Sequence, residues 1–321
     1  MSEQTPLVTV RSLVYNHEPY LRDCINGFLI QKTNFKFEVH LHDDASTDRS
    51  QAIIKEYAEK HPDIIKPFFE EENQYSKGMN ALLNWGEVKT KYVALCEGDD
   101  YWTDPNKLQM QVDFLEAHPE YSMCFHDVDI KAEKGRECYD VFGKLEDRDY
   151  TGMENMVTWS VPTCSMVMRR EVYLSRPMNP KFTMGDNVVV LTASRMGKIR
   201  CIPKKMGVYR LTPTSWIGGQ SAKVQRYKYI SHYLGLIEEF EECRCTTMYD
   251  ILENQYFQLL SILKREGNKE EFEKVKAAYL NYPGENHFSR FQSYYTKDRI
   301  RGTLKALLGK GFVKMYRKMR G

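Results

Sequence analysis

The sequence has no long apolar run and no leader-like start. Its first ten residues, MSEQTPLVTV, have neither the basic residues nor the apolar stretch of a signal peptide. No window approaches the roughly 20 consecutive apolar residues that a membrane-spanning helix needs. Internal repeats and low-complexity tracts are also missing. We therefore expect a cytoplasmic globular protein.

Paired cysteine motifs are missing as well. The eight cysteines are scattered, without the CxxC spacing typical of a zinc site. Cys243 and Cys245 form a C-x-C pair in EECRCTT, and no second pair lies nearby. A metal or redox site is one interpretation of this pair. The other is that these cysteines, like the rest, are small core residues.

What is present is enough apolar material for a substantial core. The 321 residues are 42% hydrophobic and 28% charged, which suits one large core or a core with a smaller appendage. The net charge of +2 conceals an asymmetry, because residues 297–321 carry +8 and the rest of the chain −6. A basic surface, if the protein has one, is expected at the C-terminus.

Short apolar runs alternate with amphipathic stretches over the first 130 residues. Strands are expected at residues 7–16, 35–44, 64–70, 91–96 and 121–130, and helices at 18–31, 46–61, 76–88 and 106–118. Ser46 or Thr47 is the expected N-cap of the second helix. This alternation predicts an α/β fold with a parallel sheet and right-handed crossovers.

The pattern changes in the second half of the chain. Residues 131–150 are charged and weakly periodic, which indicates a loop or an edge hairpin. A helix is expected at 186–197, followed by two β-like runs, KIRCIP and MGVYRL. Beyond Trp216 the apolar residues recur at helical spacing, so a helical C-terminal region is expected from there.

Three of the predicted strands end in conspicuous polar residues. These are Tyr15 and Asn16, then Asp43 and Asp44, and finally the segment 97–100 in VALCEGDDYW. Ligands of open parallel sheets bind outside the carboxyl ends of the strands. One crevice could therefore collect all three groups.

The carboxylates of Glu97, Asp99 and Asp100 repel one another unless donors or a cation lie nearby. Mg²⁺ and Mn²⁺ prefer oxygen ligands and typically use one or two carboxylates together with substrate phosphates. A metal–diphosphate site is thus one interpretation of the cluster. A solvated acidic turn before the next helix is the other.

Several segments together resemble the inverting glycosyltransferases of family 2. They are VTVRSLVYNHEPYLRDCINGFLIQ, FEVHLHDDASTDRS, NQYSKGMNALLNWGEVKTKYVALCEGDDYWTDPNKLQMQVDFL, TCSMVMRREV and FTMGDNVVV. The resemblance implies a GT-A fold, which is Rossmann-like with a mostly parallel central sheet flanked by helices. The implied domains are a nucleotide-sugar-binding catalytic domain at 1–215 and a helical C-terminal region at 216–321.

The resemblance also implies a donor site and a metal site. Asp99 and Asp100 match the D-x-D-like carboxylates that contact ribose and a metal, Mn²⁺ or Mg²⁺. Glu97 stands where many members have Asp. The implied nucleotide-sugar residues are Tyr15, Asn16, Glu18, Asp43, Asp44, Asn73, Gly78, Asn80, Asp99 and Arg210. Asp43 could instead orient its loop, and Asp48 is expected to cap or brace the next helix.

The resemblance also implies that a cationic side chain compensates the negative charge of the diphosphate. Arg210, or the nearby Lys204 and Lys205, is expected to compensate it. Many relatives have a histidine shortly after the matching arginine, whereas this chain has Leu211 and Thr212. A protein metal ligand from this loop is therefore not expected.

Inversion needs a base that takes the acceptor hydroxyl proton on the face opposite the leaving nucleotide. Asp186 in TMGDNVV matches the family's acidic residue near a helix start, although an aspartate there can also be an ordinary N-cap. The implied acceptor-side residues are Trp102, Thr163, Cys164, Ser165 and Trp216. For Thr163 to Ser165 a plain buried strand is the alternative, and for Trp216 plain packing.

The sequence thus predicts a metal-assisted transferase that moves a sugar, most simply from a UDP-sugar, to a glycan or lipid-linked saccharide in bacterial polysaccharide biosynthesis. A catalytically inactive glycan- or nucleotide-binding module and a two-carboxylate glycoside hydrolase are the alternatives. The basic tail, 297–321, has apolar residues at roughly helical spacing and predicts peripheral contact with an anionic membrane at the inner face of the cell. Nucleic acid is not an expected partner, because no aromatic-rich basic platform accompanies the charge of the tail.

Overall fold

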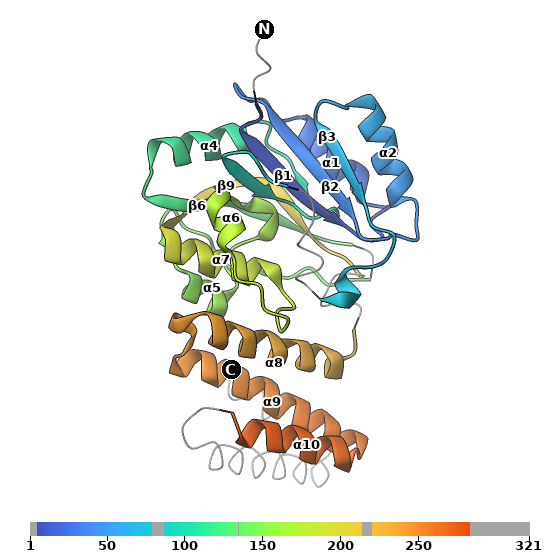
Figure 1. Ribbon diagram of the computed structural model, residues 1–321, viewed down its shortest axis with the longest axis vertical. Coiled ribbons are helices and arrows are strands. Elements are labelled where there is room, and N and C mark those ends of the chain that lie inside the picture. Colours follow the sequence, from blue (N-terminus) through green and yellow to red (C-terminus); the bar gives the residue numbers. More distant parts are fainter. Residues whose placement is uncertain (1–4, 79–86, 134, 214–219, 283–321) are drawn as a thin grey trace. The chain divides into compact units, whose positions relative to one another are not determined.

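The computed structural model describes residues 5–78, 87–133, 135–213 and 220–282 (Figure 1). The described strands are β1 (Val8–Val14), β2 (Phe37–Asp43), β3 (Ile65–Phe69), β4 (Tyr92–Leu95), β5 (Tyr101–Trp102), β6 (Tyr121–Ala132), β7 (Asp149–Tyr150), β8 (Val167–Arg169) and β9 (Lys198–Leu211). The described α-helices are α1 (Leu21–Leu29), α2 (Ser50–Lys60), α4 (Lys107–Ala117), α5 (Gly152–Thr158), α6 (Arg170–Ser175), α7 (Gly185–Met196), α8 (Ala222–Glu239), α9 (Thr246–Glu266) and α10 (Lys269–Leu280). Single 3₁₀ turns occur at Tyr75–Lys77, Thr163–Ser165 and Glu241–Cys243.

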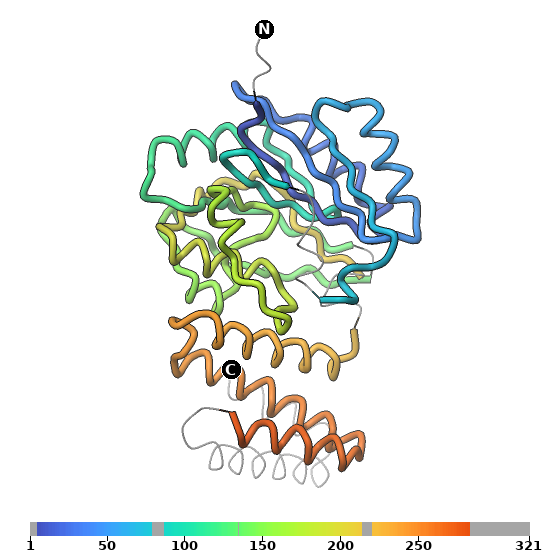
Figure 2. Tube along the Cα trace, in the orientation of Figure 1, coloured from blue at the N-terminus to red at the C-terminus, as the bar shows by residue number. Residues whose placement is uncertain are grey.

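All these strands form one sheet in the order β3-β2-β1-β4-β8-β6-β9-β5, with β7 paired to β9. Strands β1 to β3, in blue in Figure 2, lie side by side and parallel, and β4 continues this arrangement. The predicted α/β architecture with a parallel core is therefore confirmed. Antiparallel pairings join β8 to β4 and β6, and β5 and β7 to β9. Alternating apolar residues do not report strand direction, so this part of the topology was not predictable from the pattern.

Successive side chains of the central strands pack alternately into two apolar layers, one on each face of the sheet. Tyr92 and Ala94 of β4 join the layer formed with α1, α2 and α4. Val93 joins the other layer, formed with α6 and α7, which Figure 1 shows against one face of the sheet. Because both faces are covered, the central strands are buried almost throughout, as is typical of parallel sheets.

The two β-like runs expected after residue 197 are one continuous strand, β9. The register against β6 shifts between His126 and Asp127, whose partners on β9 are Ile202 and Lys205. Residues 203 and 204 are the extra residues of this irregularity, which is a place where a strand tolerates proline. Both predicted runs are therefore strand, and they are joined through Lys204 and Lys205.

Two helix starts also differ from the prediction. Helix α2 begins at Ser50, not after Ser46 or Thr47, because both of these residues lie in the preceding loop. In the segment expected to be a helix at 76–88, the described part contains a 3₁₀ turn at Tyr75–Lys77, and residues 79–86 lie outside the described chain.

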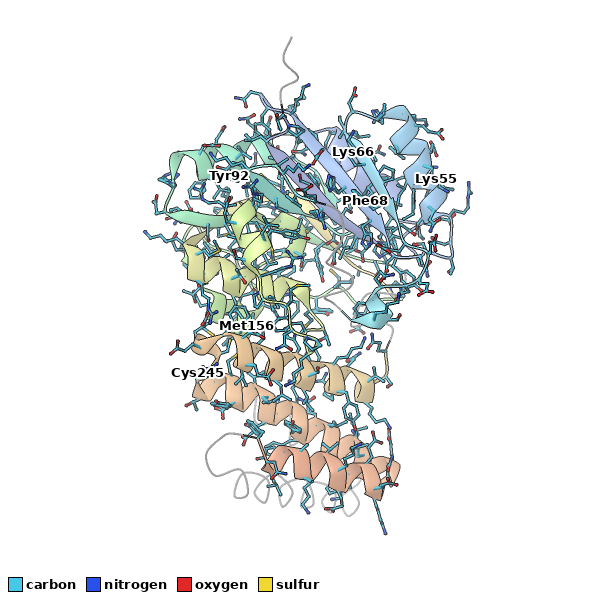
Figure 3. All side chains as sticks on the ribbon, viewed as in Figure 1. Lys55, Lys66, Phe68, Tyr92, Met156 and Cys245 are labelled. Atoms are coloured by element: carbon cyan, nitrogen blue, oxygen red, sulfur yellow. The ribbon has the colours of Figure 1, made fainter. Side chains whose placement is uncertain are left out.

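Strand β3 forms one edge of the sheet, beside α2. Lys66 and Phe68 of this strand, and Lys55 of α2, are labelled in Figure 3. Pro67, between the two labelled β3 residues, has no N–H to offer, and a lysine and a proline on an edge strand discourage pairing with another chain. The ring of Phe68 packs instead on His40 of β2, with centroids 5.0 Å apart.

The chain divides into two compact units. The first contains Met1–Gln220 with Leu234–Cys243, and the second contains Ser221–Tyr233 with Arg244–Gly321. The predicted helical C-terminal region is confirmed by α8, α9 and α10. In the second unit the Tyr279 hydroxyl of α10 donates a buried hydrogen bond of 2.9 Å to Glu253 of α9.

Among the described helices, none combines the length and the apolar character that crossing a bilayer requires. The basic tail at 297–321 lies outside the described residues. All eight cysteines are free thiols, and neither Cys243 nor Cys245 belongs to a metal-binding group within the described chain.

Gly27 sets the distance between α1 and the sheet. A Cβ at this position would lie 2.7 Å from the backbone N of Trp102 and 2.8 Å from its O. We expect Gly27→Ala to lower the free energy of unfolding by about 1–3 kcal/mol, because backbone atoms cannot move aside as a flexible side chain would. Urea unfolding measures this, with the exposed Asn26→Ala on the same helix as control. An unchanged or raised midpoint for Gly27→Ala would show that the helix shifts without cost.

Candidate active site

Parallel pairing brings the three polar strand ends to one edge of the sheet, as expected. The N–H of Asp44 donates to Val14 O at 2.9 Å, and the N–H of Gly98 donates to Leu13 O at 2.9 Å. A Cβ on Gly98 would lie 2.8 Å from His17 Nδ1 and 2.9 Å from Val14 Cγ2. A glycine is therefore required for the acidic segment to approach the end of β1 this closely.

Hydrogen bonds join the loop after β1 to the loop after β2. Asn16 has a positive φ of 56°, and its Oδ1 accepts from Thr47 N–H at 2.8 Å. Glu18 N–H donates to Asp48 Oδ2 at 2.9 Å, and Glu18 Oε2 accepts from Arg49 N–H at 3.1 Å. Asp48 Oδ1 also accepts from Ser50 N–H at 2.9 Å, as expected for a residue that braces α2. Asn16 and Glu18 thus shape the loops through their side chains.

Tyr15, by contrast, keeps 45% of its surface exposed beside these loops. Of the implied nucleotide residues after β1 it is the most exposed, whereas Asn16 and Glu18 are half-buried.

The two aspartates after β2 are buried. Asp44 is 3% exposed, and its oxygens accept from the N–H groups of Gln74, at 2.5 Å, and Tyr75, at 3.1 Å. Asp43 is fully buried, and its Oδ1 accepts from Ser46 N–H at 2.9 Å and from Gln51 Nε2 at 2.8 Å. This geometry favours the alternative that Asp43 orients its loop.

The segment after Asp44 folds against it. Asn73 Nδ2 donates to Asp44 O at 3.2 Å, and Asn73 Oδ1 accepts from Ser76 N–H at 2.8 Å. Gly78 has φ of 108°, a conformation that glycine adopts readily. Asn80 lies outside the described residues.

The acidic segment forms a tight turn, in which Asp100 N–H donates to Glu97 O at 3.1 Å. Asp100 is 1% exposed, and its Oδ1 accepts from the backbone N–H of Arg210 at 2.7 Å. The other oxygen, Oδ2, is buried and has no hydrogen-bond partner among the described residues, although the Cys164 thiol, a weak donor, lies beside the carboxylate. Burial and the charge of Asp99 raise the pKa of Asp100 well above its usual range.

Glu97 lies in the same turn, close to the negative charges of Asp99 and Asp186. Solvent reaches part of its side chain, but the surrounding protein still penalises the charged form. Desolvation, followed by the charges of Asp99 and Asp186, raises the pKa of Glu97 to about 8. The neighbouring negative charges thus favour the protonated form of Glu97.

Asp186 lies in the first turn of α7 and faces this cluster. Its Oδ1 accepts from Asn187 N–H at 2.8 Å, and the Thr163 hydroxyl also bonds its carboxylate. Desolvation raises the pKa of Asp186 in spite of these donors. The structure thus brings Asp186, from the second half of the chain, to the same place as Glu97 and Asp99.

The pattern in the sequence did not single out Tyr209. Its ring on β9 packs edge-on against Phe142, with centroids 5.0 Å apart. Burial, together with the charges of four carboxylates, raises the pKa of its hydroxyl well above its usual range; they belong to Asp100, Glu97, Asp99 and Asp186. The strand was predicted, but alternation alone did not say which of its residues face the carboxylates.

The residues expected on the acceptor side differ in how far they are buried. Trp102 is 1% exposed and donates from Nε1 to Cys164 O at 2.7 Å, and Cys164 and Ser165 are fully buried. The core encloses all three side chains, and Cys164 and Ser165 lie in the 3₁₀ turn Thr163–Ser165 before β8, not in a strand. Thr163 remains partly exposed beside Asp186. Trp216 lies outside the described residues.

The residues expected to compensate the diphosphate, Arg210, Lys204 and Lys205, have carboxylate partners within the protein. The side chain of Arg210 is 1% exposed and pairs with Asp23 and, at 3.0 Å, with Glu133. Lys204 pairs with Asp104 at 2.6 Å, and Lys205 with Asp129 at 2.7 Å. The guanidinium is therefore already neutralised within the protein, and so is each lysine.

The donor set fits a metal that arrives together with a substrate. Among the described residues no group of three or more His, Cys, Asp or Glu side chains is arranged to hold an ion unaided. The buried Asp100 Oδ2 and the Asp99 carboxylate offer the hard oxygen ligands that Mg²⁺ or Mn²⁺ would take, with phosphate oxygens completing the shell.

The carboxylates gather where the parallel strands β1, β2 and β4 end, which is the edge at which open α/β sheets bind their ligands. The model of the family "Glycosyl transferase family 2" matches residues 12–174, about half of the chain. The chain therefore belongs to this family, which confirms the resemblance seen in the sequence.

A relative in Mycobacterium tuberculosis, uncharacterized protein Rv1520, is 37% identical over 209 residues, covering 63% of this chain and 58% of that one. The chain thus spans less than two thirds of the length of this relative. Staphylococcus aureus TarS 1-349 in complex with UDP-GlcNAc has a TM-score of 0.56 at 18% identity, covering 79% of this chain and 72% of that one. Pyrobaculum calidifontis mannosyltransferase PcManGT in complex with GDP-Man and Mn²⁺ has a TM-score of 0.54 at 16% identity, covering 96% and 89%. These likenesses confirm the fold.

The buried amine of Lys107 predicts how the stability of the protein changes with pH. Its Nζ lies 3.7 Å from the ring centroid of Trp102 and has no hydrogen-bond partner among the described residues. Burial lowers the pKa of Lys107 from 10.5 to about 7. Between pH 7 and pH 10.5 the amine of Lys107 is protonated in the unfolded chain but largely neutral in the folded protein. Its contribution therefore makes the free energy of unfolding rise with pH.

We expect Lys107→Met to raise the free energy of unfolding at pH 7, because it removes the cost of burying the amine. The same change should remove this residue's part of the rise in stability between pH 7 and pH 10, as measured by urea unfolding at several pH values. Lys55→Met, at an exposed lysine, is the control. A less stable variant at pH 7 would mean that contact with Trp102 outweighs the desolvation cost.

Proposed function

We propose that the protein is an inverting, metal-assisted glycosyltransferase that moves a sugar from a nucleotide-diphosphate sugar to a glycan or lipid-linked saccharide. The observation that carries this proposal is that Asp186 and the acidic turn 97–100, from different parts of the chain, lie close enough to act together on Glu97 and on the Tyr209 hydroxyl. An inverting displacement needs a base and a diphosphate site on opposite sides of one sugar. The family and the fold support the transferase reading over a glycoside hydrolase.

The donor would lie along the carboxyl ends of β1, β2 and β4. Tyr15, Asp44 and the loop at Asn73 border the nucleotide in this proposal, while Asp99 contacts ribose. Binding of UDP-GlcNAc by TarS and of GDP-Man by PcManGT supports a nucleoside-diphosphate donor, and we propose a UDP-sugar. Complexes of PcManGT with Mn²⁺ support the same metal here, held by Asp99 and Asp100.

In the chemical step, Asp186 accepts the proton of the acceptor hydroxyl. The acceptor oxygen forms a bond to the anomeric carbon while the bond from that carbon to the diphosphate oxygen breaks. Thr163 and the N–H of Asn187 hold the Asp186 carboxylate in place. A bound divalent cation supplies charge neutralisation for the departing diphosphate. The elevated pKa of Asp186 makes it a better base than a solvated aspartate.

Asp186→Asn tests the base. We expect kcat to fall about 100-fold or more, because the amide cannot accept the proton, while KM for the donor stays within about two-fold. Product formation from a panel of nucleotide-sugars with Mn²⁺ measures this, and NMR of the product reports inversion. Asp113→Asn, an exposed aspartate of α4, is the control.

Three results would contradict this part of the proposal. Full activity of Asp186→Asn would remove it as the base, and a retained anomeric configuration would remove inversion. Donor binding by the wild type without turnover, given a range of saccharide acceptors, would favour an inactive binding module.

We also propose that the tail brings the enzyme to the inner face of the membrane, where a lipid-linked acceptor would lie. The support is its sequence, with a local charge of +8 among apolar residues. Co-sedimentation with vesicles of an anionic lipid should fall sharply when residues 297–321 are deleted, since each cation near the surface contributes about 1 kcal/mol. Equal binding by the truncated chain would remove the tail as the membrane contact.

A further inference from the structure

Arg210 occupies a central position between three elements near the proposed metal site. Its side chain is 1% exposed, and each nitrogen of the guanidinium has a partner within the protein. Nε donates to Glu133 at 3.0 Å, Nη1 donates to Asp99 O at 2.8 Å, and Nη2 donates to Asp23. The guanidinium carbon also lies 4.4 Å from the ring centroid of Tyr101.

The partners of Arg210 come from separate parts of the sequence. Asp23 lies in the first turn of α1, and Glu133 directly follows β6. The ring of Tyr20, which precedes α1, stands 5.2 Å from the guanidinium carbon. A buried guanidinium is tolerated only when carboxylates and hydrogen-bond acceptors compensate it, so these groups fix its position.

The same residue contacts both aspartates of the acidic turn, Asp100 through its carboxylate and Asp99 through its backbone carbonyl. Its backbone N–H binds Asp100 Oδ1 at 2.7 Å, while its side chain binds the carbonyl of Asp99. One oxygen of Asp100 is thereby occupied, and the buried Oδ2 is left for another ligand. Hydrogen bonds to residues that bind a metal orient these ligands and tune their affinity for it.

The charges at this point disfavour direct contact with a diphosphate. One guanidinium faces two carboxylates, Asp23 and Glu133, so the group as a whole is negative. A diphosphate would have to displace at least one of these carboxylates to reach the guanidinium. The geometry instead provides a rigid support behind the Asp99–Asp100 turn.

We infer that Arg210 is a positioning residue, held by Asp23 and Glu133, that sets the Asp99–Asp100 turn for divalent-metal binding and does not itself bind the diphosphate. This inference rests on the metal-assisted function proposed above. It predicts that carboxylates remote from the metal, on α1 and after β6, control metal affinity.

The test uses the full-length protein and measures Mn²⁺ binding by electron paramagnetic resonance in the presence of UDP and, separately, of GDP. We expect the double variant Asp23→Ala/Glu133→Ala, and also Arg210→Lys, to bind Mn²⁺ about 10-fold or more weakly, since changes to residues that hold a metal ligand have effects of this size. Lysine cannot supply three fixed donors, so it should not rescue the site. Glu56→Ala is the control, because it removes the exposed ion pair of Arg22, the neighbour of Asp23.

Direct binding of the diphosphate by Arg210, the alternative to positioning, predicts a different result for the double variant. If the guanidinium binds the diphosphate, releasing it from its carboxylates should tighten metal-free UDP binding, as calorimetry would show. That result, or unchanged Mn²⁺ affinity in the variants, overturns the inference. So does a wild type that binds no Mn²⁺ with either nucleotide.

Thermal unfolding without metal checks that each variant is folded. Asp23 and Glu133 are partly exposed, so the double variant decides the matter if Arg210→Lys does not fold. Failure of the proposed function is seen separately, as Mn²⁺–nucleotide binding by the wild type without sugar transfer. In that case the variants still report on the role of Arg210 through the Mn²⁺ affinity.

Discussion

Mutual repulsion among carboxylates is the constraint on which this site depends. Glu97, Asp99 and Asp100 share one turn, and Asp186 faces them from α7. Such an arrangement is costly unless donors, protons or a cation offset the charge. The protein supplies part of the compensation itself, through the backbone N–H of Arg210 on Asp100 and the N–H of Asn187 on Asp186. The remaining negative charge suits a divalent cation.

The fold explains how residues so distant in sequence come together. Parallel strands place the ends of β1, β2 and β4 at one edge, and the loops behind them are fixed by hydrogen bonds between Asn16, Thr47 and the neighbouring segment. The antiparallel strands then bring in the second half of the chain. Strand β9 runs past the acidic turn and contributes Tyr209 and Arg210, while the 3₁₀ turn before β8 places Thr163 beside Asp186. Rigid elements, rather than one flexible loop, thus carry the proposed chemistry.

Much of the first half of this architecture could be predicted from the sequence, because runs of apolar residues and helix-length spacers constrain parallel β-α-β units strongly. The same pattern located Asp99 and Asp100, since polar residues at the end of a buried strand stand out. Directions of short strands such as β8 were not predictable, because a three-residue run carries no directional signal. The continuity of β9 was not predictable either, because an irregularity in its pairing with β6 joins two apolar runs into one strand.

Burial of individual side chains was the hardest feature to predict. Trp102 looked like a surface for an acceptor in the sequence, but Gly27 lets α1 approach so closely that the indole is enclosed. Arg210 looked like a partner for phosphate, because its two carboxylate partners lie far away in the sequence, at Asp23 and Glu133. Such long-range pairings leave no local pattern, so only the three-dimensional structure distinguishes a ligand-binding arginine from an internal one.

The central claim is that the Asp99–Asp100 turn is a metal–diphosphate site organised from behind by Arg210. A crystal structure with UDP and Mn²⁺, with anomalous scattering measured at the manganese edge, tests it most directly. The account predicts an anomalous peak within coordination distance of Asp100 Oδ2 and of the diphosphate, with Arg210 still bound to Asp23 and Glu133. A peak elsewhere, or a guanidinium turned onto the diphosphate, would contradict it.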